Sequence, residues 1–101
     1  MQKKAIVLNA KDNVATALAD LEAGEVVEMD TDKGSLSVTL ANAIPFGHKF
    51  SLRQTKSGSH ILKYGEVIGE ATADIEPGQH VHVHNVASTR GRGDIARGAS
   101  R

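Results

Sequence analysis

Glycine residues divide the second half of the chain into short runs. After Pro45 the β-prone runs cover residues 49–52, 61–64, 67–72 and 79–86, and the glycines around them are Gly47, Gly58, Gly65, Gly69 and Gly78. Runs of this length that are rich in Val and Ile and bounded by glycine are typical of strands. We therefore predict a mostly β, compact domain.

The first half adds three strands and one helix to this prediction. Residues 3–8 read as a strand, and residues 25–29 and 35–40 alternate apolar and polar side chains around a turn, as in a hairpin. Between Asn13 and Leu21, apolar residues recur at helical spacing, with Gly24 as a stop signal. This segment is predicted to be the one short helix.

Three segments resemble one another: residues 19–27, 52–61 and 73–81. Each holds a turn closed by a glycine and then a β-branched residue. The glycines, Gly24, Gly58 and Gly78, are unequally spaced, which argues against a solenoid. We interpret the segments as three turns of one body, in which glycine supplies a positive φ.

Composition limits the chemistry that the chain can perform. The 101 residues include no cysteine and only 3% aromatic residues. Disulfides, thiolate nucleophiles and zinc ribbons are thereby excluded, and any metal would need His or carboxylate ligands. A chain of this size supports one modest core, so a large enclosed active site is not expected.

The zero formal net charge conceals an uneven distribution. Residues 1–85 carry 8 basic and 11 acidic groups, whereas residues 86–101 carry four Arg and one Asp. We predict a domain at 1–88 and an Arg/Gly-rich tail at 89–101. The tail lacks interleaved aromatic residues, so no nucleic-acid partner is expected. The longest apolar run, residues 5–8, is too short for a membrane helix, and with no export signal recognised we expect a cytoplasmic location.

The most unusual segment is His80-Val81-His82-Val83-His84-Asn85. In a strand, alternate side chains share a face, so the three histidines would line one surface while the valines point to the core. Residues two apart lie roughly 6.8 Å from each other, so one metal ion could take two of these imidazoles. Metal or acid–base chemistry, anion binding and a plain hydrogen-bonded strand face all remain open.

A second candidate site follows the turn Pro45-Phe46-Gly47. His48 and Lys49 come directly after it, at a strand start, where ligand-facing residues are common. His48 could act as an acid–base group and Lys49 could pair with a carboxylate, although an ordinary surface turn would look the same. His60 is interpreted as structural or exposed.

Taken in order, several motifs resemble the SAF domain of the altronate and galactarate dehydratases. They are Ile44-Pro45 with Gly47-His48-Lys49, Ile61-Leu62-Lys63-Tyr64-Gly65 with Ile68-Gly69, and Ala73-Asp74-Ile75 with Gly78 and the histidine segment. The similarity spans about residues 5–94. It implies a β-clip fold and a part in removing water from an aldonic or aldaric acid.

The resemblance also implies how the work is divided. The chain would be a small subunit or N-terminal domain that needs a large dehydratase subunit. Whether the assembly contains further copies of this chain is left open. The metal would be Fe²⁺, with Mn²⁺ or Mg²⁺ as alternatives, held mainly by the large subunit. The residues expected to take part are His48 and Lys49 in catalysis, His80, Lys63 and Asn85 in substrate binding, and His82 and His84 at the metal.

Two alternatives accompany this expectation. The same pattern resembles the small subunit of sulfolactate sulfo-lyase, which eliminates sulfite instead of water. SAF-like domains also occur as non-catalytic carbohydrate-binding modules.

Overall fold

The computed structural model describes residues 4–7, 9, 11–31 and 34–88, and every regular element in them is a strand. The strands are β1 (Ala5–Ile6), β2 (Val14–Ala17), β3 (Val26–Thr31), β4 (Gly34–Thr39), β5 (Lys49–Ser51), β6 (His60–Lys63), β7 (Glu66–Ala71), β8 (His80–Val81) and β9 (Val86–Ser88). The predicted mostly β domain is confirmed. Among the described residues, none belongs to a helix of the length and hydrophobicity that crossing a membrane requires. The predicted tail lies outside the described residues.

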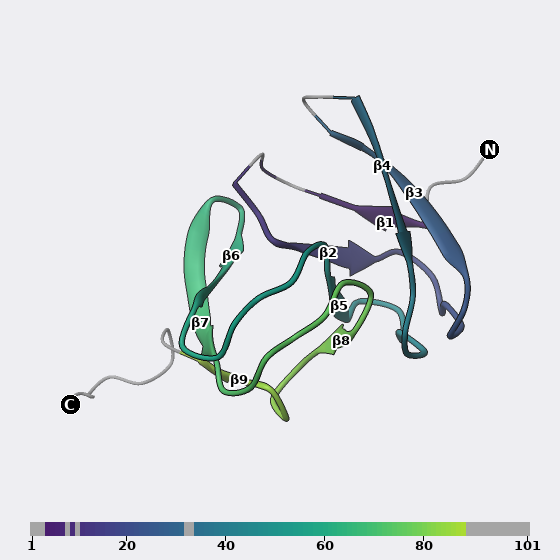
Figure 1. The fold of residues 1–101 in the computed structure, drawn as a ribbon. Coiled ribbons are helices and arrows are strands. Elements are labelled where there is room, and N and C mark those ends of the chain that lie inside the picture. Colours follow the sequence, from purple (N-terminus) through teal and green to yellow (C-terminus); the bar gives the residue numbers. More distant parts are fainter. Residues whose placement is uncertain (1–3, 8, 10, 32–33, 89–101) are drawn as a thin grey trace.

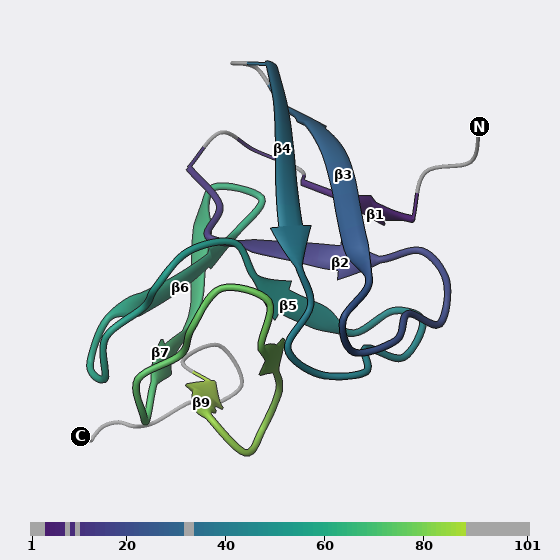
Figure 2. The ribbon, with the colours of Figure 1, turned by 45° about the vertical axis from the view of Figure 1, so that its right-hand side comes forward.

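The strands form three antiparallel sheets. One has the order β1-β2-β5-β8, the second is the β3–β4 hairpin, and the third has the order β6-β7-β9. Figure 1 shows the hairpin on one side of the four-stranded sheet and the three-stranded sheet on the other, and Figure 2 shows the same arrangement after rotation. The four-stranded sheet therefore joins the two halves of the sequence.

The helix predicted over residues 13–21 is wrong, because this segment forms β2 and a turn. Three of the four β2 side chains are buried, since β2 lies between β1 and β5 inside the fold. The apolar residues at helical spacing are Val14, Ala17, Leu18 and Leu21, and only the first two of them lie in β2. Asn13 also ties the segment to β6: its amide donates to the His60 carbonyl at 3.0 Å and accepts from the Leu62 N–H at 2.9 Å. Such long-range bonds override local helix propensity.

Four similar turns connect the strands, and the sequence comparison grouped three of them. Each ends at a glycine with positive φ, namely Gly24 (87°), Gly47 (84°), Gly58 (89°) and Gly78 (83°). The turns pair through backbone hydrogen bonds, Leu21 with Ile44 at 2.9 Å both ways, and Thr55 with Ile75 at 2.8 and 2.7 Å. The turn at Gly47 escaped the sequence comparison because Pro45 and Phe46 stand where the other turns have at least one polar residue.

Two groups of buried hydrophobic side chains form the core. The larger group packs the four-stranded sheet against the β3–β4 hairpin and includes Ile44 and Phe50, both 0% exposed. The smaller group includes Ile61, Ile75 and Val81 and lies toward the three-stranded sheet. Strand β5 contributes Phe50 to the larger group and β8 contributes Val81 to the smaller one, and most of the candidate site residues lie on or beside these two strands.

Candidate metal site and adjoining pocket

The pairing of β5 with β8 brings two distant histidine segments together. Lys49 lies opposite Val81 and Phe50 opposite His80. The residue before β5, His48, therefore stands at the level of His82. Its position is fixed by the turn at Gly47, whose N–H donates to the Ala17 carbonyl at 2.9 Å.

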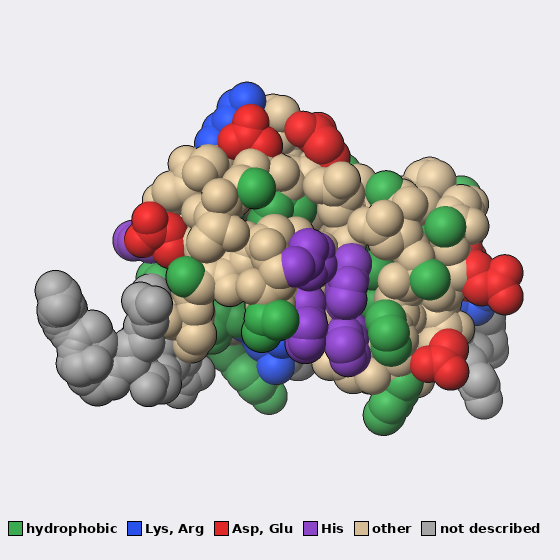
Figure 3. All heavy atoms as spheres, turned by 90° about the horizontal axis from the view of Figure 1, so that it is seen from below, with side chains coloured by type: hydrophobic (Ala, Val, Ile, Leu, Met, Phe, Trp, Pro, Cys, Tyr) green, Lys and Arg blue, Asp and Glu red, His purple; other side chains and the backbone are tan. Residues whose placement is uncertain are grey.

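Three imidazole rings stack in this place. The ring centroids of His48 and His82 are 4.5 Å apart, those of His48 and His80 are 5.0 Å apart, and those of His80 and His82 are 5.4 Å apart. A hydrogen bond of 2.8 Å joins His48 Nδ1 and His80 Nε2, with one ring donating and the other accepting. We call these three residues the histidine triad. Figure 3 shows the histidine cluster on one face of the molecule, beside hydrophobic side chains.

The triad has the geometry of a metal site. One ring nitrogen from each of the three residues lies within 4.8 Å of the other two. The donor set is made of imidazole nitrogens, which suit Fe²⁺ or Zn²⁺, whereas Mg²⁺ prefers oxygen ligands. Three protein ligands also leave coordination positions for a substrate, as in catalytic metal sites. The residues therefore fit a divalent transition metal.

The metal ligands predicted from the sequence were His82 and His84, and the structure groups them differently. His82 belongs to the triad, while His84 is exposed and approaches His80, with a centroid distance of 5.4 Å and a tilt of 39°. His48 and His80, which were assigned to catalysis and substrate binding, are the partners of His82. His60 is exposed on β6, as expected.

The histidine segment is not a continuous strand, contrary to prediction. Strand β8 ends at Val81, and residues 82–85 form a turn. Val81 is buried as predicted, but Val83, predicted to face the core, is 82% exposed. Asn85 closes the turn: its side-chain oxygen accepts from the His82 N–H at 3.0 Å and its amide donates to the His80 carbonyl at 2.8 Å. These bonds occupy the side chain that was predicted to bind substrate.

Burial and neighbouring charge lower the pKa of His80. Partial burial disfavours the imidazolium form, and His48, His84, His82 and Lys49 add repulsion. The lowered pKa keeps His80 neutral near pH 7. Neutral imidazole is the form that binds a metal ion.

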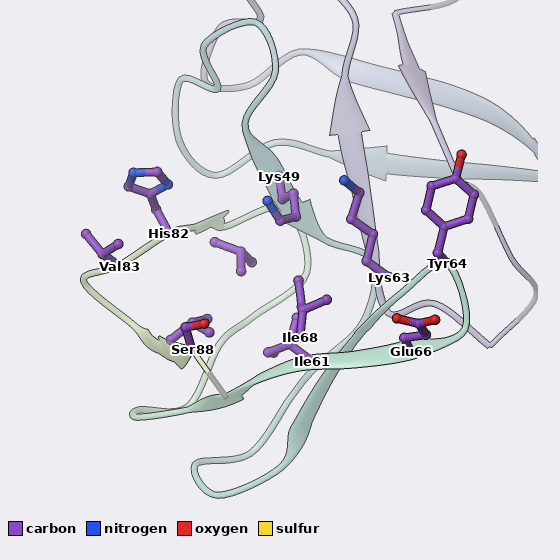
Figure 4. A pocket seen from close by; sticks show the side chains of 11 residues that line it. Lys49, Ile61, Lys63, Tyr64, Glu66, Ile68, His82, Val83 and Ser88 are labelled. Atoms are coloured by element: carbon purple, nitrogen blue, oxygen red, sulfur yellow. The ribbon is translucent and has the colours of Figure 1, made fainter. Parts of the chain in front are cut away.

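A pocket of about 680 Å³ adjoins the triad. It lies between the four-stranded and three-stranded sheets, and its described lining residues are Lys49, Ile61, Lys63, Tyr64, Glu66, Ile68, Val81, His82, Val83, Val86 and Ser88. His82 belongs to both the pocket and the triad. Figure 4 shows Lys49 and Lys63 between His82 on one side and Tyr64 on the other.

The two lysines make this pocket cationic. Lys49 projects from β5 and Lys63 from β6, and both are half-buried. Burial lowers the pKa of Lys49, and the charge of Lys63 lowers it further. Both lysines were predicted as site residues, and the structure places them in one pocket.

The comparisons with known proteins give the family of this chain. A family model described as the altronate/galactarate dehydratase SAF domain matches residues 3–89. The chain belongs to this family.

Two kinds of relative are similar to this SAF domain. Altronate dehydratase of Escherichia coli is 48% identical over 80 residues, which are 79% of this chain and 15% of that protein; the Bacillus subtilis altronate dehydratase is 39% identical over 83 residues, 16% of its length. The SAF domain thus spans about a sixth of the dehydratases it matches. The (2R)-sulfolactate sulfo-lyase subunit alpha of Chromohalobacter salexigens is 36% identical over 89 residues, 84% of this chain and 94% of that subunit.

Sequence reasoning missed the wall of the pocket opposite the triad. Tyr64 and Glu66 lie at the β6–β7 turn, where Tyr64 has a φ of 61° and its N–H donates to the buried Asp12 carboxylate at 3.0 Å. The available signal was Asp12, a carboxylate just before the segment that was predicted to be a helix. It holds this turn, and with it one end of the pocket.

Proposed function

We propose that this SAF domain is the small, non-autonomous part of a hydro-lyase that removes water from an aldonic or aldaric acid, working with a larger catalytic chain. The observation that carries the proposal is the histidine triad beside a cationic pocket. A metal site with open positions next to positive charge suits a 2-hydroxy acid, which offers a carboxylate and a hydroxyl group as ligands.

Support for a partner chain comes from the small number of acid and base groups at the site. Water elimination needs a base to remove the proton next to the carboxylate and an acid to protonate the departing hydroxide. Of the described residues that line the pocket, only Glu66 is a carboxylate, and the triad holds none. A related protein of nearly the same length is named a subunit alpha, which implies a second subunit in that enzyme.

In this proposal the residues of this chain bind and orient the substrate. His48, His80 and His82 would hold the metal ion, which supplies Lewis acidity toward the hydroxy acid when bound. Lys49 and Lys63 attract the anionic substrate into the pocket. His84 stands beside His80 of the triad and is exposed toward solvent or a partner chain.

A second candidate is the small subunit of a (2R)-sulfolactate sulfo-lyase. It is favoured by the extent of the match, since the aligned region covers 94% of such a subunit but only 15% of an altronate dehydratase. The same triad and pocket would serve there, because sulfolactate is also a 2-hydroxy acid.

Reconstitution tests both candidates. The full chain is mixed with a large catalytic chain of either enzyme class, and elimination from altronate, galactarate and sulfolactate is followed by formation of the keto acid and release of sulfite. We expect activity only in the mixture, with one substrate class preferred. Activity of this chain alone would contradict the accessory role. Binding of a neutral carbohydrate, with no stimulation of any large chain, would instead support a binding module.

A further inference from the structure

We propose that Lys49 and Lys63 form a second anion subsite, which selects 2-hydroxy acids carrying another carboxylate or a sulfonate at the end remote from the metal. This inference rests on the proposed function and narrows its substrate class. It favours an aldaric or sulfonated acid over a monoanionic aldonic acid.

The first step is the position of the two ammonium groups. Lys49 comes from β5 and Lys63 from β6, which belong to different sheets, and both side chains line the same pocket. Two ammonium groups repel each other, and the repulsion is stronger where they are partly buried. An anionic group between them removes that repulsion and accepts charge-assisted hydrogen bonds from both.

The second step is the surroundings of the pair. Ile61, Ile68, Val81 and Val86 supply aliphatic walls, and the described lining has two lysines but one carboxylate, Glu66. Aliphatic walls lower the local polarity, so the attraction between an ammonium group and an anion is stronger here than at an open surface. The pocket therefore favours a short ligand that ends in a negative charge.

The third step is the connection to the triad. His82 offers a ligand atom to the triad and also lines the pocket, and Lys49 directly follows His48 in the chain. A ligand whose hydroxy-acid end meets the triad has its other end directed along the pocket toward the lysines. Only a ligand with a second anion gains from both ends of this arrangement.

Binding measurements with matched acids test the proposal. The full chain is loaded with Co²⁺, and its affinities are measured by calorimetry for malate against 2-hydroxybutanoate and for 3-sulfolactate against lactate. In each pair, the monoanion has a methyl group or a hydrogen atom in place of the second charged group of the dianion. We expect the dianion to bind roughly tenfold more tightly in both pairs.

Variants separate the subsite from general charge effects. Lys63→Met should reduce the preference for the dianion to below about threefold, because the affinity for malate falls more than the affinity for 2-hydroxybutanoate. Lys56→Met, which removes an exposed lysine of the turn at Gly58, should keep the wild-type preference. Chelation of Co²⁺ by the acids in solution is the same for all variants, so it does not affect this comparison.

Three results would overturn the subsite: equal binding of dianions and monoanions, an equal loss of both in Lys63→Met, or no binding of either acid. A preference confined to 3-sulfolactate would assign the subsite to sulfonates, and a preference in both pairs assigns it to either anion. A different result would contradict the proposed function alone: the domain prefers dianions, but no large chain mixed with it produces elimination.

Discussion

His48 and His80 are 32 positions apart in the sequence, yet their ring nitrogens Nδ1 and Nε2 lie 2.8 Å from each other. This contact exists because the turn at Gly47 delivers His48 to the start of β5, and β5 pairs with β8. A bound metal ion would take the place of the proton that the two rings share.

Replacing one triad residue should weaken metal binding. His48→Ala, His80→Ala or His82→Ala removes a ligand, and the affinity for Co²⁺ or Zn²⁺ should fall by at least about tenfold. His60→Ala is the matched control, because His60 is exposed on β6 and lies outside the triad. Titration of the full chain followed by absorption of Co²⁺ measures the effect. An unchanged affinity in all three variants would rule out the triad as a metal site.

Replacing Lys49 should stabilise the free domain. Its pKa is lowered by burial and by Lys63, so the charged form costs stability in the folded state. Lys49→Met should raise the melting temperature by a few degrees at pH 7. The folded-state pKa lies below the usual 10.5, so the wild type gains stability as the pH rises through this pKa toward 10.5, and the difference should shrink. Thermal melts between pH 7 and 10.5 measure this. A lower melting temperature at pH 7 would contradict it.

Two glycines with the same backbone conformation should respond differently to alanine. A Cβ on Gly78 would lie 2.1 Å from the Thr39 carbonyl oxygen, whereas a Cβ on Gly58 would meet nothing within 4 Å. Gly58→Ala should lower the free energy of unfolding by about 1 kcal/mol through its positive φ alone. Gly78→Ala should lower it by about 3 kcal/mol or more. Urea unfolding measures both, and equal losses would refute the role of the backbone contact.

Replacing Asn85 should lower the stability of the domain more than its affinity for ligands. Its side chain makes two hydrogen bonds inside the turn of residues 82–85 and is 8% exposed. Asn85→Ala leaves the part-buried His80 carbonyl and His82 N–H without these partners, so the free energy of unfolding should fall by about 1–3 kcal/mol. His84→Ala, in the same turn but exposed, is the control and should have little effect on unfolding. Loss of ligand affinity without loss of stability would restore Asn85 as a binding residue.

Local patterns were enough to predict the β class and many of the turns. The short runs between glycines became strands, and the turns at Gly24, Gly58 and Gly78 were recognised from their residues. Local patterns failed at β2, because burial inside a sheet produces the same apolar spacing as a helix face.

The sequence predicted which residues belong to the site but not which of them lie together. His48, Lys49, Lys63, His80 and His82 were all named from the sequence, and the structure gathers them at β5, β6 and β8. Which of them meet depends on pairing between distant strands, and one short chain contains no local signal for such pairing. His84 was grouped with His82 on the assumption of a straight strand, and the turn at residues 82–85 changed its neighbours.

The order of strands in the four-stranded sheet has a consequence for how the domain forms. The strands β2, β5 and β8, which are neighbours in this sheet, come from the beginning, the middle and the end of the described chain. During synthesis on the ribosome, β2 and β5 emerge well before β8, so the triad stays incomplete until nearly the whole domain has been made. Pairings between such distant segments close late and slowly. We therefore expect a nascent chain to acquire its affinity for metal only in the last step of folding.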